Sequence, residues 1–304
     1  MRTAKAAAAI LGLWVLASCA SNPKPVSFYK ELPDVFAPLA PGASAYLYID
    51  VPAARPILEL ADFGAISGLA TKDALDMTET AAAALYPKGT ARRYMAVAQG
   101  KFPSFRSALS FTFSSSWKKN KSETGNAYWH SDAFGVSMAL NKNTAYVSDG
   151  DPFIVPPGFE SPQRLRELQA GSAMAGLVED AADPINSFFS ALGISLKFPA
   201  ERIFFGLYGD PGNTGSSGFD LYSGLFYVET PTPSQARAFQ SIFSLARAFL
   251  GSAAAWEDDP AAEAMAALFT HPPELDGSSL IIRTGPMTAE GMALLFSMFS
   301  VYSE

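Results

Sequence analysis

Hydrophobic and polar positions alternate in several short stretches of the chain, as they do in strands that lie on a core. The stretch from Phe134 to Leu140 shows this period, and the turn Asn141-Lys142-Asn143 after it predicts a hairpin with a returning strand over 144–148. Short apolar runs predict further strands over 45–51, 93–100, 173–179, 202–209, 220–229 and 279–283.

Apolar residues three and four positions apart predict amphipathic helices between these strands. The run Thr232-Pro233-Ser234-Gln235 has the pattern of a capping box and opens one helix, which Gly251 ends. Its apolar stripe is Phe239, Ile242, Phe243, Ala246, Phe249 and Leu250, and the last helix has Met292, Leu295, Phe296 and Phe299 at the same spacing. Strands, helices and a hairpin together predict an α+β fold, with amphipathic helices packed on mainly antiparallel sheets.

The two halves of the chain begin alike. An offset of 128 residues places 44–67 on 172–195, with a strand followed by a helical stripe in both, and Asp183 is expected to cap the second helix. The run 93–100 also resembles 202–209. Two explanations stay open: an internal duplication, which predicts two similar lobes, and convergence of two strand–helix units in an alanine-rich chain.

The first residues have the features of a secretory signal peptide. Arg2 and Lys5 form a positive start, and Ala6 to Ser18 then runs without a charge. This apolar run is too short to span a bilayer, which takes about 20 residues. It ends in Leu16-Ala17-Ser18-Cys19, and Cys19 is the single cysteine of the sequence.

This ending resembles the lipobox of bacterial lipoproteins, a resemblance that covers only the signal segment. It implies a diacylglycerol on the Cys19 thiol, cleavage between Ser18 and Cys19, and acylation of the new amino terminus, which together anchor the protein in a membrane. Ala20 and Ser21 stand where an aspartate would imply inner-membrane retention. The expected location is therefore the cell envelope, at the outer membrane and facing the periplasm or the cell surface. The alternative is a plain signal peptide with an incidental cysteine.

Breaks in the pattern divide the chain into five segments. Prolines between Cys19 and Ser44 predict a semi-rigid tether, and a second cluster of proline and glycine predicts a linker near the middle. The expected segments are a signal peptide over 1–18, lipidated Cys19 and tether over 19–44, an N-terminal α+β lobe over 45–148, a linker over 149–163 and a C-terminal α+β lobe over 164–304.

Composition narrows the choice of partners. With 49% hydrophobic and 17% charged residues the chain has ample material for a core, and no cysteine follows Cys19 to form a disulfide. Loss of the signal peptide with Arg2 and Lys5 makes the formal net charge −9 instead of −7. This acidic balance disfavours nucleic acid and anionic headgroups as partners.

The sequence lacks HExxH, GxSxG, GxGxxG and Walker motifs. His130 stands beside Ser131 and Asp132, but neighbours on a strand point to opposite faces and so cannot form a relay among themselves. His271 is interpreted as a residue at a helix C-terminus. Ser-x-x-Lys occurs twice within 115–119, and we interpret it as a serine-rich loop that leads into a solvated basic segment over 118–121.

Two acidic clusters, 149–151 and 257–259, lack the ligand spacing of an EF-hand and are interpreted as loop residues. No cofactor or metal is expected. Aromatic residues crowd the strands on either side of the loop Gly209–Gly218. If helices cover only one sheet face, these aromatics mark a binding surface, for which the candidates are Tyr208, Tyr222, Phe226 and Tyr227; if both faces are covered, they are core.

These observations predict a non-enzymatic, lipid-anchored envelope protein that binds or scaffolds another envelope component. One alternative is a carrier that holds a small apolar or aromatic ligand in a cleft between the lobes. Another is a hydrolase of unrecognised type, which would need His130 or His271 within hydrogen-bond reach of a serine and a carboxylate.

Overall fold

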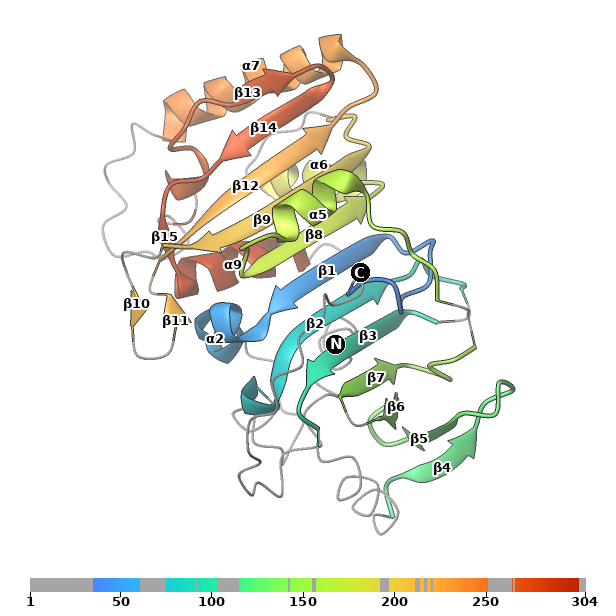
Figure 1. The fold of residues 1–304 in the computed structure, drawn as a ribbon. Coiled ribbons are helices and arrows are strands. Elements are labelled where there is room, and N and C mark those ends of the chain that lie inside the picture. The colour runs from blue at the N-terminus through green and yellow to red at the C-terminus, as the bar shows by residue number, and fades with distance from the viewer. Residues whose placement is uncertain are drawn as a thin grey trace. The chain divides into compact units, whose positions relative to one another are not determined.

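A computed structural model describes twelve stretches of the chain: residues 35–60, 75–90, 92–102, 115–141, 143–154, 157–191, 197–210, 214–215, 218–219, 221–250, 264 and 266–300. The chain divides into two units (Figure 1). Unit 1 comprises Met1–Val51 and Asp62–Pro162, and unit 2 comprises Pro52–Ala61 and Gln163–Glu304. Within these stretches thirteen strands form antiparallel sheet, seven of them in unit 1 and six in unit 2, and helices accompany them. The predicted α+β class with mainly antiparallel sheet is confirmed.

Unit 1 contains an antiparallel sheet in the order β1-β2-β3-β7-β6-β5-β4. The strands are β1 (Ala45–Asp50), β2 (Thr78–Leu85), β3 (Tyr94–Gly100), β4 (Lys118–Lys121), β5 (Ala127–Ser131), β6 (Val136–Leu140) and β7 (Thr144–Ser148). The predicted hairpin joins β6 to β7, and the Asn141 side chain accepts the N–H groups of Asn143 and Thr144 at 3.1 and 2.9 Å. An Asx turn of this kind reverses the chain, as the sequence indicated.

Irregular segments cover one face of this sheet near β1. Phe36 and Leu39 are fully buried, and the Phe159 ring lies 6.0 Å from Phe36 and 3.6 Å from Tyr46, between ring centroids. The Tyr46 hydroxyl donates to the carbonyl of Ala40. Residues 35–44, at the end of the expected tether, lie in unit 1, and several of their apolar side chains are buried. Residues 19–34 lie outside the described residues.

The strand predicted from Phe134 to Leu140 begins at Val136. Its alternation does not separate a buried from an exposed face, since Ser137 and Ala139 are buried along with Val136 and Met138. The basic segment 118–121 is exposed at its lysines, as expected of a solvated segment, and it forms the strand β4, which pairs with β5.

Unit 2 contains an antiparallel sheet in the order β13-β14-β12-β9-β8, and β15 also pairs with β12. These strands are β8 (Met174–Glu179), β9 (Arg202–Gly209), β12 (Leu221–Glu229), β13 (Glu274–Asp276), β14 (Ser279–Arg283) and β15 (Met287–Thr288). A separate ribbon joins β10 (Thr214–Gly215) to β11 (Gly218–Phe219).

The helices of unit 2 are α2 (Val51–Leu60, in this unit from Pro52), α5 (Gln163–Gln169), α6 (Ala182–Ala191), α7 (Pro233–Leu250) and α9 (Ala289–Ser300). Thr232 Oγ1 accepts the Gln235 N–H at 3.3 Å, which confirms the predicted cap of α7. Asp183 is not the N-cap of α6, because the helix already begins at Ala182; it lies in the first turn, where the helix dipole favours an acidic residue. No helix of the described residues is long and apolar enough to cross a bilayer.

A cluster of buried hydrophobic residues forms the core on the helix side of the unit 2 sheet. Its centre is formed by aromatic rings: Phe239 lies 4.6 Å from Phe198, and Phe243 lies 4.6 Å from Phe269, between centroids. Strand residues from β12 and β14 complete it, namely Val228, Leu280 and Ile282. The described part of the stripe predicted for α7, Phe239, Ile242, Phe243 and Ala246, therefore packs on one sheet face.

The order strand, helix, antiparallel strand occurs twice, as β1-α2-β2 and as β8-α6-β9. The correspondence between 93–100 and 202–209 does not fit this order. Residues 93–100 contain β3, which pairs with β2, whereas β9 pairs directly with the first strand of its own unit. The alanine-rich β2 was not predicted as a strand, and its omission produced the wrong alignment. The shared order of these three elements does not by itself make the two units similar lobes.

We expect Phe243→Ala to lower the free energy of unfolding by about 3–5 kcal/mol, because truncation of a buried ring loses apolar burial and leaves a cavity. Leu245→Ala on the same helix is the matched control. Leu245 is 58% exposed, and its truncation should change stability by no more than about 0.5 kcal/mol. Chemical denaturation of both variants measures the difference, and equal losses would contradict this account of the core.

Candidate functional site

The two faces of the unit 2 sheet differ in how they are covered. Side chains on β9 and β12 alternate between the faces, and residues directly opposite each other in the ladder share a face. One face lies against α6 and α7. The other bears α5, and we call the partly exposed residues Tyr208, Leu225, Tyr227 and Ile281 on it the α5 face. Figure 1 shows α5 on one side of β8 and β9, with α7 on the other side of the sheet.

The structure separates the four aromatic residues expected to mark a binding surface. Tyr222 is fully buried and donates its hydroxyl to the carbonyl of Ala53 at 2.9 Å, so it is a core residue. Phe226 packs against the core beneath α7. Tyr208 and Tyr227 lie on the α5 face and are only partly buried. Two of the four candidates, Tyr208 and Tyr227, thus lie on the α5 face, and the other two lie on the face that packs against helices.

Helix α5 holds Tyr208 in place. Leu165 and Leu168 bury the apolar side of this short helix, and the Tyr208 hydroxyl donates to the carbonyl of Leu168 at 3.0 Å. Burial raises the pKa of Tyr208, and the nearby Tyr227 adds to the rise. Gly206 allows the Tyr208 ring to lie along the strand, since a Cβ at this position would come within 2.8 Å of the Tyr208 hydroxyl. The ring is therefore neutral and fixed.

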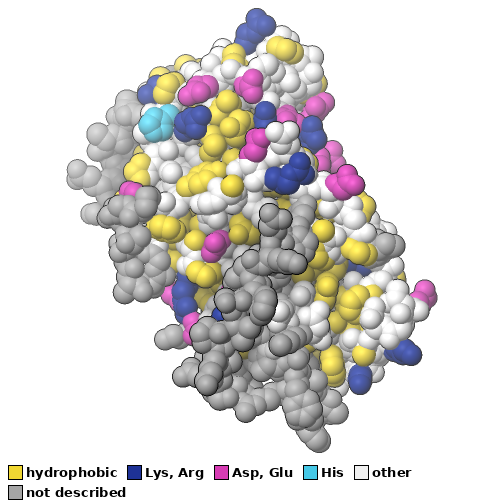
Figure 2. Space-filling view, in the orientation of Figure 1, with side chains coloured by type: hydrophobic (Ala, Val, Ile, Leu, Met, Phe, Trp, Pro, Cys, Tyr) yellow, Lys and Arg dark blue, Asp and Glu magenta, His cyan; other side chains and the backbone are white. Residues whose placement is uncertain are grey.

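A network of charges borders the α5 face. The Arg164 guanidinium carbon lies 4.4 Å from the centroid of the Tyr227 ring, within the range of a cation–π contact. Arg164 also lies 3.7 Å from Glu229 and 3.5 Å from Asp276, and Glu229 forms a 2.7 Å ion pair with Arg202. Figure 2 shows hydrophobic side chains between basic and acidic ones on this side. Such a surface can bind an apolar or aromatic group and orient it by charge.

Sequence reasoning missed the charged part of this surface. Alternation along β12 places Glu229 on the same face as Tyr227, so the position of this carboxylate could be predicted from the sequence. Arg164 could not be placed, because a helix over 163–169 is too short to show clear periodicity.

A second cluster brings His130 between a serine and a carboxylate. His130 Nδ1 lies 2.8 Å from Ser137 Oγ, and Nε2 lies 3.2 Å from Asp132 Oδ1. Lys118 Nζ donates to the other Asp132 oxygen, which lowers the pKa of Asp132. Ser131 is not involved; its place is taken by Ser137, directly opposite His130 in the β5–β6 ladder. This pairing could not be read from neighbours in the sequence.

The exposure of this cluster is the reverse of what acyl transfer needs. A nucleophilic hydroxyl must reach substrate, yet Ser137 is fully buried, whereas the Asp132 side chain is 66% exposed. The cluster links β4, β5 and β6, the strands at one end of the unit 1 sheet. Its polar contacts therefore hold these three strands together.

The remaining candidates show no convergent chemistry. His271 is exposed and follows a short helical stretch over 266–268. The Asp149 carboxylate accepts the Arg93 N–H, and Asp151 accepts the Phe153 N–H at 2.8 Å, as expected of loop residues. Within the described stretches no group of three or more His, Cys, Asp or Glu residues could hold a metal. Ser18, Cys19 and the cluster 257–259 lie outside them.

We expect a fluorophosphonate probe to leave the full chain unmodified, because the Ser137 hydroxyl is buried. Ser137→Ala should leave the labelling unchanged and lower the free energy of unfolding by about 1 kcal/mol through the lost hydrogen bond. Mass spectrometry detects the adduct. Stoichiometric labelling that Ser137→Ala abolishes would instead establish the hydrolase alternative.

No family model and no curated protein matches the chain. Among solved structures it is similar to three crystal forms of TP0453, a membrane-associated protein of Treponema pallidum. Form I aligns with a TM-score of 0.61 and 17% identity, over 90% of this chain and 100% of that one. Forms III and IV each align with a TM-score of 0.58 and 16% identity, over 88% and 87% of this chain and 99% and 96% of theirs. At this identity the likeness is one of fold.

Proposed function

We propose that the protein is a non-enzymatic, lipid-anchored envelope protein that binds another envelope component through the α5 face of unit 2. The observation that carries the proposal is the organised set of charges beside the apolar residues of the α5 face. Leu225, Tyr227 and Ile281 are partly exposed there, and Arg164 is held by Glu229, by Asp276 and by the Tyr227 ring.

The envelope location rests on two independent supports. The signal ending at Cys19 has the residue types of a lipobox, which implies attachment of acyl chains that insert into a membrane. The fold is similar to that of TP0453, which is membrane-associated. An anchored chain meets its partners at the membrane surface, so a binding surface on its folded body is a natural use of the anchor.

The composition of the α5 face favours a protein partner. Tyrosine and arginine are enriched among the residues that contribute most to protein interfaces, because each combines a large contact area with hydrogen-bonding capacity. Arg164 is already oriented by Glu229, Asp276 and the Tyr227 ring. A partner would therefore meet a preorganised surface, which reduces the entropy lost on association.

Replacement of Cys19 by alanine should abolish incorporation of labelled fatty acid and cleavage by the lipoprotein pathway, because the thiol is the acceptor of the lipid. Radiolabelled palmitate and the mass of the mature chain measure both events. Persistent incorporation in Cys19→Ala would contradict the anchor assignment.

Leu225→Lys should reduce co-purification of envelope proteins with the tagged full chain by about ten-fold or more, since a charge in the centre of an interface must be desolvated. Leu245→Lys on exposed α7 is the matched control and should retain the same proteins. Quantitative mass spectrometry of membrane extracts compares the two variants, after circular dichroism establishes that both are folded.

Equal retention by both variants would contradict binding through the α5 face. The carrier alternative makes a different prediction: native mass spectra of the purified chain would then show an excess mass that denaturation removes, whether or not Leu225 is changed.

A further inference from the structure

The turns at the two ends of the unit 1 sheet differ in chemistry. At one end, the turn from β4 to β5 reads Ser-Glu-Thr-Gly-Asn over 122–126, and the turn from β6 to β7 reads Asn-Lys-Asn over 141–143. These are polar residues and glycine, as is usual for turns in water. The large exposed hydrophobic residues in the described stretches of unit 1 are Leu85, Phe134 and Ile154, at 41%, 37% and 53% exposure, and they lie at the other end.

Strand pairing places these three residues at one end of the sheet. Leu85 is the last residue of β2 and lies opposite the first residues of β1 and β3. Phe134 lies in the turn from β5 to β6, and Ile154 follows β7. The start of β3 pairs with the end of β7, which in turn pairs with the start of β6. We call Leu85, Phe134 and Ile154 the apolar rim.

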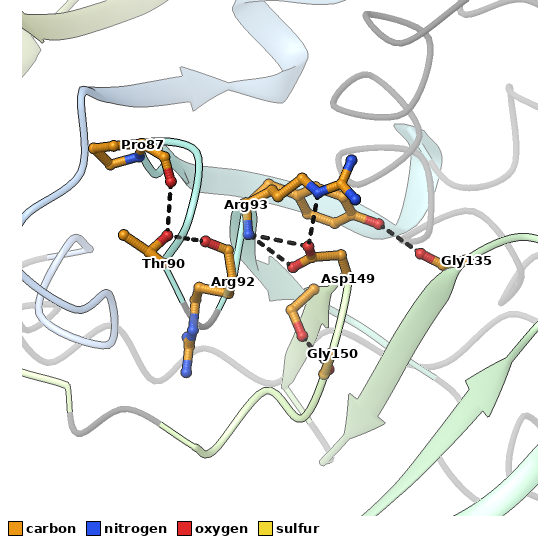
Figure 3. A network of polar contacts seen from close by, with 9 residues as sticks. Pro87, Thr90, Arg92, Arg93, Gly135, Asp149 and Gly150 are labelled. Carbon is orange, nitrogen blue, oxygen red and sulfur yellow. Dashed lines mark hydrogen bonds and ion pairs between the residues drawn. The ribbon is translucent and has the colours of Figure 1, made fainter.

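Hydrogen bonds join the connections that carry the apolar rim (Figure 3). The Tyr94 hydroxyl donates to the carbonyl of Gly135 at 3.2 Å, which ties the start of β3 to the turn from β5 to β6. The Arg93 N–H donates to both oxygens of Asp149, at 3.1 and 3.0 Å, which ties the same turn before β3 to the segment after β7. The fold therefore holds these connections together at one end.

The chain that leads from the expected lipid anchor reaches the sheet at this end. Ala40 accepts the hydroxyl of Tyr86, and the Ser44 N–H donates to the carbonyl of Leu85 at 2.7 Å. Residues 19–34 separate the anchor from the first described residue, and a chain of that length spans at most roughly 55 Å. The tether thus confines the folded body near the membrane, and the side chains of the body decide which surface faces it.

Charged residues beside the apolar rim suit a layer of lipid headgroups. Lys88 and Arg93 are exposed in the turn after Leu85, Arg93 with 70% of its side chain. Long basic side chains can keep their charge in water or at a lipid phosphate while their stems lie against apolar chains. Lys118 is paired with Asp132, so both signs of charge are present. Apolar tips among mixed charges match the interface of a zwitterionic bilayer.

We propose that the lipid-anchored chain docks on its bilayer with this end of unit 1 and inserts the apolar rim into the interfacial layer. This docking rests on the proposed lipid anchor and adds the surface that meets the membrane. Apolar side chains gain free energy when they leave water, and the anchor raises their effective concentration at the bilayer, so small individual contributions suffice. The polar turns at the opposite end of the sheet then face away from the bilayer.

The test uses the full mature chain on phosphatidylcholine vesicles, with and without lipid that carries a doxyl quencher. Cys19 is the single cysteine and its sulfur carries the proposed lipid, so an introduced cysteine is the free thiol for an environment-sensitive fluorophore. Labels at Phe134→Cys and Ile154→Cys should shift their emission to the blue when vesicles are added. Doxyl lipid should remove about half of this emission, because interfacial apolar groups lie about 5–10 Å into the boundary of headgroups and acyl chains.

Glu123→Cys, in the polar turn at the opposite end, is the matched control, because this side chain is also exposed and its label should be quenched little. Ile154→Asp in the chain labelled at Phe134→Cys should remove most of the quenching, since a carboxylate must lose its hydration to enter the interface. Emission recorded before vesicles are added tests whether other residues of the chain already cover the rim.

If the chain sediments with the vesicles while the labels at 134 and 154 stay unquenched, the docking surface is overturned and the anchor stands. Emission that is already blue-shifted in solution and does not change with vesicles also overturns it, because protein then covers the rim. Equal quenching at Glu123→Cys contradicts the proposed orientation. A mature chain that does not sediment with vesicles contradicts the anchor, and the docking with it.

Discussion

The burial of one face of the unit 2 sheet under α6 and α7 determines what the rest of this unit can do. The sequence contains no disulfide-forming pair, so apolar packing must stabilise the fold. Phe239 and Phe243 supply much of it, together with Val228 and Leu280 on the strands. Once helices cover this face, the alternate residues of β9 and β12 must lie on the other. Among the described helices the short α5 lies on that face, and Tyr227 is partly exposed there.

The sheet of unit 1 also has to bury an apolar face, and different elements cover it. The face near β1 is covered by irregular segments, with Phe36 and Phe159 as the principal rings. Irregular backbone needs its own hydrogen bonds, and these come from side chains such as Tyr46 and Tyr86, whose hydroxyls bond to Ala40. Covering of this kind accommodates polar side chains more readily than a helix stripe does. It is in this setting that Arg92 becomes buried with part of its guanidinium unpaired.

The sequence allowed the elements with strong periodicity to be predicted, and the structure confirms them: the cap of α7 and its stripe from Phe239 to Ala246, the hairpin β6–β7, and the strand β14 with its bounds. It did not reveal β2, since four successive alanines carry no alternation, nor the packing of residues 35–44, since proline-rich composition resembles a spacer. Which sheet face each aromatic residue occupies follows from strand register. The odd spacing of Tyr222 and Tyr227 along β12 already separates them by face, but which face would lie under helices needed the structure, as did the meeting of His130 with Ser137.

Arg164 and Arg92 differ in whether a carboxylate balances the charge of the guanidinium. Arg164 has two carboxylates within 4 Å and the Tyr227 ring beside it, so its charge is balanced within the chain and it can serve as a fixed part of a surface. Arg92 is more deeply buried, yet its nearest carboxylates are bonded to backbone N–H groups. The cost of a buried charge rises as water is excluded, while surface pairs contribute little. Arg164, whose charge is balanced within the chain, is therefore the better platform for a protein partner.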